Sequence, residues 1–319
     1  MDYLPAILEK LAYVLLLIGS GFVCRGLGWI SDQGERELGL LMLDAAWPAL
    51  IFSSIVSTLD AGDILANIWL PALSLLIHVA GFGLGLAAAR LFGFRGDRRR
   101  VFLFNCTMNN FLAMALPFAE LFFPGRGTAL LSVANLGSVI AIWTLGVYAI
   151  AGAPDPRQTL RHLYSPGMIA TLAAIFCVLS GAGRLIPRLF LDVLATIGQP
   201  TLVLGMIVAG AQIYKLGRRA LRFDLWNIAT GLLRNLAIPA AMLGIALLFR
   251  GRLTREALVL FTLVGATPAS INSIPMAMKY GSDPELAAQG VIFTHLLGIF
   301  TMAMFISLIR TLLFQDAIP

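Results

Sequence analysis

The sequence predicts an all-α membrane protein with about ten transmembrane helices, and three observations support this prediction. Hydrophobic residues make up 59% of the chain and charged residues only 13%, whereas soluble domains carry roughly 45–50% and about 25%. Apolar runs long enough to cross a bilayer recur along the whole chain. The prolines that interrupt these runs recur in both halves. A lipid bilayer is therefore the expected solvent for most of the surface.

The expected spans follow one another with short gaps that are rich in Gly, Pro, Arg and Asp. They run near residues 7–30, 37–58, 65–92, 99–121, 127–151, 165–181, 189–213, 223–249, 256–278 and 285–313. No gap is long enough for a soluble domain. We therefore divide the chain into a first five-helix repeat at 1–151, a short cytoplasmic linker at 152–164 and a second five-helix repeat at 165–319.

The ends of the chain and its basic residues predict the orientation. The first apolar stretch is too long for a cleavable signal and lacks a basic n-region, so we expect it to be a span. If both termini face outward, the loops on the inner side carry more Lys and Arg residues than the loops on the outer side. The cluster between Arg95 and Arg100 accounts for much of this excess. We therefore expect a multi-pass protein of the bacterial inner membrane with both termini outside.

Several classes of function are disfavoured by the residues that they would need. The net charge of +6 comes from residues in short gaps between apolar runs, and no nucleic-acid motif accompanies it. Cysteines 24, 106 and 177 lie far apart without metal-ligand spacing, so we expect neither a disulfide nor a metal or cofactor. Histidines 78, 162 and 295 are scattered, which disfavours a membrane enzyme. The chain has no phosphate-binding loop for primary active transport.

Prolines occur at matching positions in the two halves of the chain. Pro48 in the second span corresponds to Pro200 in the seventh, and Pro117 in the fourth corresponds to Pro275 in the ninth, at nearly equal spacing. Each half contains an odd number of spans, so the second half must enter the membrane from the opposite side. Inverted five-span repeats are typical of secondary transporters.

The fourth and ninth spans are predicted to be broken helices. Proline removes a backbone donor, and Asn, Ser and Thr cluster around both sites, so the opened backbone must lie against protein or water. The N-termini of half-helices carry partial positive charge and can hold a carboxylate. We expect a substrate site formed by polar residues and prolines of these two spans: Asn109, Asn110, Pro117, Ser270, Asn272 and Pro275. The alternative for the asparagines is that they only cap the frayed helices.

These segments resemble the auxin efflux carrier family, which includes plant auxin exporters and bacterial carriers of malonate-like organic acids. The resemblance covers nearly the whole chain and rests on five blocks: Trp47 to Phe52, Asn110 to Pro117, Ser165 to Ala170, Leu232 to Arg234 with Pro239, and Pro268 to Asn272 followed by Tyr280 to Glu285. It implies two inverted repeats whose fourth and ninth helices cross at their prolines, an architecture like that of sodium/proton antiporters. It also implies an elevator-type movement and organic anion substrates.

Ionisable and polar residues within the spans are further candidates. Asp44 is a candidate for proton coupling, or else stays hydrated near the membrane face. Arg234 is a candidate for attracting the anion, or else extends to the cytoplasmic face. Asn135 is a candidate for facing the crossing. For His78 and His295 we expect helix-to-helix hydrogen bonds.

The sequence therefore predicts a secondary transporter of a small organic anion, not an enzyme. The alternative is a sodium-coupled carrier of the bile-acid type or a cation/proton antiporter, which would need acidic residues near the crossing. The expected partners are the anion and the lipid bilayer, and a homodimer is left open.

Overall fold

Helices account for nearly all of the computed structural model, which describes residues 3–152, 164–216 and 223–313 and has no strand in these ranges. Most of the expected linker, including His162, lies outside the described residues. The helical elements are α1 (Tyr3–Gly26), α2 (Asp32–Leu41), η1 (Met42–Ala46), α3 (Trp47–Thr58), α4 (Ala61–Ala66), α5 (Leu70–Leu91), α6 (Gly96–Thr107), α7 (Phe111–Phe122), α8 (Gly127–Ala141), η2 (Ile142–Gly146), α9 (Val147–Ala151), α11 (Pro166–Leu179), η3 (Ala182–Leu185), α12 (Arg188–Gly198), α13 (Thr201–Leu216), α14 (Leu225–Leu232), η5 (Leu233–Ala237), α15 (Ile238–Leu248), α16 (Arg255–Ala266), α17 (Ser273–Lys279) and α18 (Pro284–Leu313).

Six helical stretches of the described residues are long and apolar enough to cross a membrane. They are Asp32–Thr58, Ala61–Leu91, Gly127–Ala151, Arg188–Lys215, Leu225–Leu248 and Pro284–Leu313. Two shorter apolar helices, Ala12–Gly26 and Pro166–Leu179, fall where the first and sixth spans are expected. The remaining two expected spans are interrupted, and neither half alone has the length of a span.

Prolines within the continuous spans are accommodated by wide helical turns. The π-helical turn η1 directly precedes Pro48, and η5 directly precedes Pro239. A proline supplies no N–H and crowds the carbonyl one turn earlier, and a wider turn relieves both problems without ending the helix. Because of these turns, the spans that contain Pro48 and Pro239 stay helical through the proline, whereas Pro200 falls in a turn between α12 and α13.

Two of the expected spans are interrupted by non-helical backbone. Between α6 and α7 the backbone is extended at Met108, and between α16 and α17 it is extended at Thr267, the residue before Pro268. A residue that precedes proline disfavours the helical region, which explains the end of α16. Both segments are enclosed by protein, since residues Val101 to Thr107 and Ala257 to Ala266 are buried throughout. This burial is what a non-helical backbone within a membrane requires.

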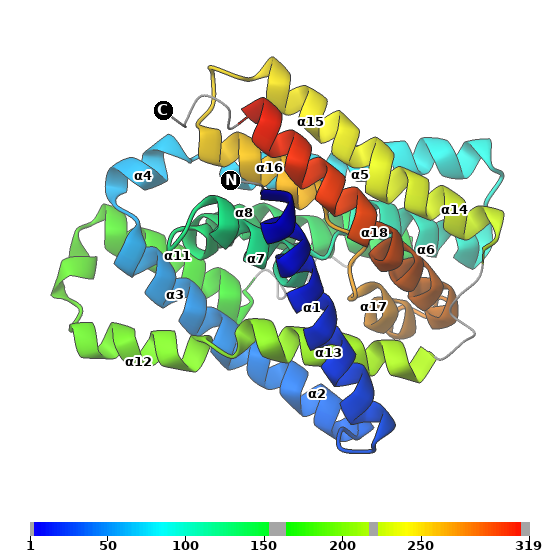
Figure 1. The fold of residues 1–319 in the computed structure, drawn as a ribbon, viewed down its shortest axis with the longest axis horizontal. Helices are drawn as coiled ribbons and strands as arrows, with labels where there is room; N and C mark the ends of the chain where they lie inside the picture. The colour runs from blue at the N-terminus through cyan, green and yellow to red at the C-terminus, as the bar shows by residue number, and fades with distance from the viewer. Residues whose placement is uncertain (1–2, 153–163, 217–222, 314–319) are drawn as a thin grey trace.

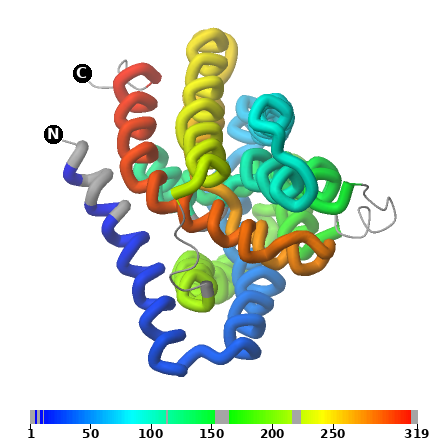
Figure 2. Tube along the Cα trace, turned by 90° about the vertical axis from the view of Figure 1, so that its right-hand side faces the viewer, coloured from blue at the N-terminus to red at the C-terminus, as the bar shows by residue number. Residues whose placement is uncertain are grey.

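The helices form two groups. In the first, α1 packs against α13, and α3 packs against α11 and α12. In the second, α5 packs against α6 and α8, while α15 to α18 pack against one another. Figure 1 shows α3, α11 and α12 at one end of the molecule and α6 and α14 at the other. In Figure 2, the blue helices of the N-terminal 58 residues diverge from a common turn, with α13 between them.

Small residues allow the first group to pack closely. A Cβ atom on Gly21 of α1 would lie 2.1 Å from the carbonyl oxygen of Ile207, and one on Gly210 of α13 would lie 1.9 Å from that of Ile18. Both positions therefore require glycine, as is usual where membrane helices approach backbone to backbone. This contact ties the first helix of the chain to the second half.

Candidate functional site

The two interrupted segments meet in an antiparallel bridge. The N–H of Asn110 donates to the carbonyl of Pro268 at 2.8 Å, and the N–H of Ser270 donates to the carbonyl of Met108 at 3.0 Å. Asn109 and Ala269 are the bridged pair. We call residues 108–110 and 267–272 together the crossover. Backbone groups that leave their helices here satisfy each other, so the break costs few unpaired groups.

The position of the crossover corrects one expectation. The segments cross at Asn109 and Pro268–Ser270, not at Pro117 and Pro275. Pro117 lies inside α7, and Pro275 lies in the first turn of α17. In a first turn the missing N–H of proline has no helical partner to lose, so Pro275 fits a helix start and does not break one.

Arg234 of η5 lies beneath the crossover and is fully buried. Its Nε donates to the carbonyl of Thr267 at 2.9 Å, Nη2 to that of Gly265 at 2.8 Å and Nη1 to that of Cys106 at 3.4 Å. One guanidinium therefore caps the carboxyl ends of both α16 and α6. Among the described residues no carboxylate pairs with it, and the alternative that it extends to the cytoplasmic face is wrong.

His78 of α5 supports the end of α6. Its Nδ1 lies 2.8 Å from the carbonyl of Thr107, and its Nε2 lies 2.9 Å from the hydroxyl of Ser138. Because a carbonyl only accepts, Nδ1 carries the hydrogen and Nε2 accepts from Ser138. The ring is buried, with both nitrogens engaged, which confirms the expected helix-to-helix hydrogen bond.

Asn110 makes its side-chain contact to a distant helix. Its Nδ2 lies 2.9 Å from Nε2 of His295 on α18, while Nδ1 of that ring lies 2.8 Å from the carbonyl of Val291. Asn110 therefore does not cap α7, and neither does Asn272 cap α17. The reading of these asparagines as helix caps is wrong. With no side-chain cap, the first N–H groups of α7 are left for another partner.

The structure brings several of the predicted residues together at the crossover. Asn109 donates through Nδ2 to the carbonyl of Val264 at 2.9 Å, and its buried Oδ1 has no partner among the described residues. The hydroxyl of Ser270 accepts from the N–H of Asn272 at 3.2 Å and keeps its own hydrogen to donate. The Asn272 side chain is exposed and makes no hydrogen bond within the described chain.

Two predicted residues lie on other elements. Asn135 of α8 is half-buried and has no side-chain partner within the described ranges. Asp44 of η1 is exposed, and η1 packs mainly against α2, α3 and α11 to α13. The π-helical turns that hold Asp44 and Arg234 each precede a proline, which is the sequence signal for both.

His78 and His295 both contact the interrupted helices, although neither is predicted from the sequence to belong to the site. Their signal was a polar residue in an otherwise apolar run. The sequence prediction also omits Thr294 of α18, whose hydroxyl accepts from the N–H of Ala269 at 3.2 Å. A threonine in a membrane helix is too common to predict such a contact.

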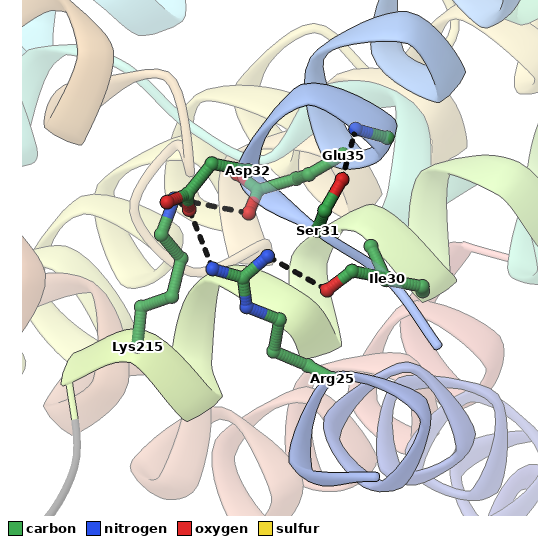
Figure 3. Close-up of polar contacts among 7 residues, drawn as sticks. Arg25, Ile30, Ser31, Asp32, Glu35 and Lys215 are labelled. Carbon is green, nitrogen blue, oxygen red and sulfur yellow. Dashed lines mark hydrogen bonds and ion pairs between the residues drawn. The ribbon is translucent and has the colours of Figure 1, made fainter. Parts of the chain in front are cut away.

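A second polar cluster lies away from the crossover, where α1, α2 and α13 end (Figure 3). Asp32 accepts from Arg25 at 2.5 Å and from Lys215 at 2.7 Å, and Lys215 also reaches Glu35 at 3.2 Å. Asp32 is largely exposed, with 74% of its side-chain surface accessible. The cluster joins the N-terminal helices to the second half and contains equal numbers of acidic and basic groups, so we assign it a structural role.

Comparison with known proteins identifies the family. A family model described as a membrane transport protein matches residues 6–306. No curated protein matches the chain.

Proposed function

We propose that this chain, which belongs to the membrane transport protein family of auxin efflux carriers, is a secondary carrier of small carboxylates that works by an elevator-type movement. The observation that carries the proposal is the uncapped amino end of α7 at the crossover, beside two helix carboxyl ends that the buried guanidinium of Arg234 neutralises.

The charge balance at the crossover favours an anion. A helix end carries a charge of about half an elementary unit, negative at the carboxyl end and positive at the amino end. The carboxyl ends of α6 and α16 together are balanced by the single positive charge of Arg234. The amino end of α7 is left unbalanced, with no side-chain cap. A negatively charged ligand completes the balance, whereas a cation would add to the excess.

The residues that we propose for substrate contact surround this end of α7. Three kinds of donor there suit a carboxylate: the first-turn N–H groups of α7, which has no side-chain cap, the carboxamide of Asn272, which has no partner among the described residues, and the hydroxyl of Ser270. Asn110 and Asn109 flank them and also fix the crossover. We propose Asn135 as a further contact, and Pro117 and Pro275 as residues that shape the helices beside the site.

We further propose that the fold is a pair of inverted five-span repeats. The six long helices, the two shorter apolar helices and the two interrupted segments fall where the ten spans are expected. The breaks also occur in the fourth span of each half. In this arrangement the group of α1 to α3 and α11 to α13 is the scaffold, and the group that holds the crossover is the moving domain. The breaks at the crossover would travel with the substrate.

We propose a bacterial inner-membrane location, with both termini outside and a homodimer formed through the scaffold. The competing sodium-coupled or cation/proton antiporter function is less well supported, because the described residues of the crossover include no Asp or Glu. Asp44 is kept as a second candidate for proton coupling.

The test is uptake into proteoliposomes of a labelled panel comprising malonate, malate, an indole acid and the neutral malonamide, with imposed pH, sodium or voltage gradients. We expect uptake of at least one carboxylate and none of malonamide, which has a similar size and no charge. Equal uptake of malonate and malonamide, or uptake of no carboxylate, would contradict the proposal.

A further inference from the structure

The hydrogen bond between Asn110 and His295 has a direction that a third group fixes. Nδ1 of His295 faces the carbonyl of Val291 at 2.8 Å, and a carbonyl can only accept. Nδ1 therefore carries the hydrogen, and in the neutral ring Nε2 is an acceptor. Asn110 must then donate through Nδ2 across the 2.9 Å contact. The carboxamide has one allowed orientation as long as the ring is neutral.

This orientation is unfavourable for an anion. One hydrogen of Nδ2 is committed to the ring, so Asn110 offers a ligand its oxygen Oδ1 and only the second Nδ2 hydrogen. A carbonyl oxygen repels a carboxylate, which also only accepts. Asn110 is nevertheless the residue directly before the uncapped first turn of α7. In the neutral state the amino end of α7 and its preceding side chain therefore oppose each other.

Protonation of Nε2 reverses the arrangement. The ring then has two N–H donors, so Nε2 can no longer accept from Nδ2 of Asn110. The carboxamide must turn over, with Oδ1 accepting from Nε2 and Nδ2 released toward the ligand. We infer that His295 is a proton-binding site, and that a proton on Nε2 frees both Nδ2 hydrogens of Asn110 for the carboxylate and turns Oδ1 away from it. This inference rests on the proposed function.

The coupling has a definite sign. The proton comes from water and stays on Nε2 while the anion is bound, and no covalent bond changes. Anion binding and proton binding favour each other, so each must raise the affinity of the site for the other by the same factor. A carrier built in this way moves a carboxylate and a proton in the same direction. Lower pH is expected to tighten anion binding.

No charged side chain is bonded to the ring of His295 within the described chain. The ring is half-buried, and within the described chain its hydrogen-bond partners are Asn110 and Val291. No ionisable side chain lies on α14 or α15, which also pack against α18. The other neighbouring helices carry these described ionisable groups, none of which is bonded to the ring: Glu9, Lys10, Tyr13, Cys24 and Arg25 on α1; Asp97, Arg98, Arg99, Arg100 and Cys106 on α6; Glu120 on α7; Tyr214 and Lys215 on α13; Arg234 on η5; Arg255 and Glu256 on α16; and Lys279 on α17.

The molecule provides a matched control. Like His295, His78 makes hydrogen bonds through both ring nitrogens. It is buried, however, and its partners are Thr107 and Ser138, which make no contact with Asn110 in the described structure. Its replacement removes an imidazole from the same group of helices without touching the contact between Asn110 and His295.

The experiment compares His295→Gln, His78→Gln and Asp44→Asn with the wild type in proteoliposomes loaded with malonate. A glutamine at 295 can accept from Asn110 but cannot take up a proton. We expect the wild type to accumulate labelled malonate under an inward proton gradient, and His78→Gln to keep the same ratio of gradient-driven accumulation to zero-gradient exchange even where its total transport is lower. We expect His295→Gln to lose gradient-driven accumulation by about tenfold while keeping malonate exchange at zero gradient. Comparison at equal pH removes the titration of malonate itself.

The outcomes separate this inference from the proposed function. Malonate transport by the wild type that responds to pH equally in His295→Gln overturns the switch and leaves the carrier intact. A loss of pH response in Asp44→Asn alone transfers coupling to that residue and also overturns the switch. If His295→Gln does not fold, calorimetry of malonate binding to the wild type in two buffers of different ionisation enthalpy decides. Uptake of about one proton per malonate supports the inference, and uptake of none overturns it.

Discussion

The α6–α7 and α16–α17 segments are broken at the same bridge, yet their ends are held differently. The carboxyl end of α6 is capped by two residues, His78 at Thr107 and Arg234 at Cys106, whereas α16 depends on Arg234 for both Gly265 and Thr267. On the far side of the crossover, Asn110 is bonded to His295, whereas the side chain of Asn272 is exposed and has no hydrogen-bond partner among the described residues.

This difference separates the residues that stabilise the crossover from the residues that we propose to contact the substrate. The last carbonyls of both α6 and α16 need hydrogen-bond donors, because a buried carbonyl without a partner destabilises the fold. After the bridge, the first segment has Asn110, whose orientation is set by His295. The second segment has Asn272, which is exposed and has no side-chain partner among the described residues. We therefore expect substitutions before the bridge to affect folding and transport together. Substitutions after the bridge should separate the two effects.

The largest effect is expected for Arg234→Met. This change leaves three buried carbonyls without a donor, each worth roughly 1–3 kcal/mol, and exposes both carboxyl ends as uncompensated negative charge. We expect a stability loss of about 3 kcal/mol or more. Malonate uptake should fall at least about tenfold, the consequence of losing roughly 1.4 kcal/mol of attraction. Thermal unfolding in detergent and vesicle uptake measure the two quantities.

Arg234→Lys is the control for charge. It keeps the positive charge but cannot reach three carbonyls with a planar fork. We expect partial transport with intermediate stability. If Arg234→Met kept the uptake and the stability of the wild type, the carboxyl ends of α6 and α16 would not depend on this residue.

The second effect compares the two asparagines. Asn110→Ala removes a hydrogen bond and leaves Nε2 of His295 unpaired, so we expect uptake to fall and stability to drop by about 1 kcal/mol. Asn272→Ala removes an exposed side chain without a partner, so we expect lower malonate affinity with unchanged stability. The malonate concentration at half-maximal uptake and the Tm of each variant test this contrast. Full transport by both variants would exclude them from the site.

The third effect compares two prolines. Pro117→Ala restores an N–H inside α7, away from the bridge, so we expect stability to be equal or higher, by up to about 3 kcal/mol, with little change in uptake. Pro268→Ala frees Thr267 to become helical, which would disrupt the bonds of Asn110 and Ser270 across the crossover. We expect it to lose uptake. Greater damage from Pro117→Ala would place the functional break at Pro117.

The smallest effect is expected outside the crossover, for Lys215→Ala. The pairs that it makes with Asp32 and Glu35 are partly exposed to solvent, and surface ion pairs contribute little. We expect a shift in Tm of less than about 2 °C and unchanged uptake. A strong transport defect would give the cluster in Figure 3 a role in the movement of the two helix groups.

Much of the crossover could be predicted from local sequence. Pro268 forces Thr267 out of the helical region, and Asn109 and Asn110 are poor helix formers directly after the extended Met108, so both breaks have a cause within a few residues. Pro117 and Pro275 misled the prediction of the exact crossing. A proline in a first turn or a buried helix interior is tolerated where its neighbours satisfy the freed groups, and those neighbours are remote in sequence.

The sequence alone determined the membrane class, the division into spans and the two interrupted segments, because hydropathy and proline act over a few residues to a few turns. The tertiary structure alone decided which groups meet. Arg234 reaches both helix ends, and His295 fixes the orientation of Asn110, across separations of 128 and 185 residues. Burial, hydrogen-bond direction and charge compensation depend on distance in space, and no local pattern encodes that distance.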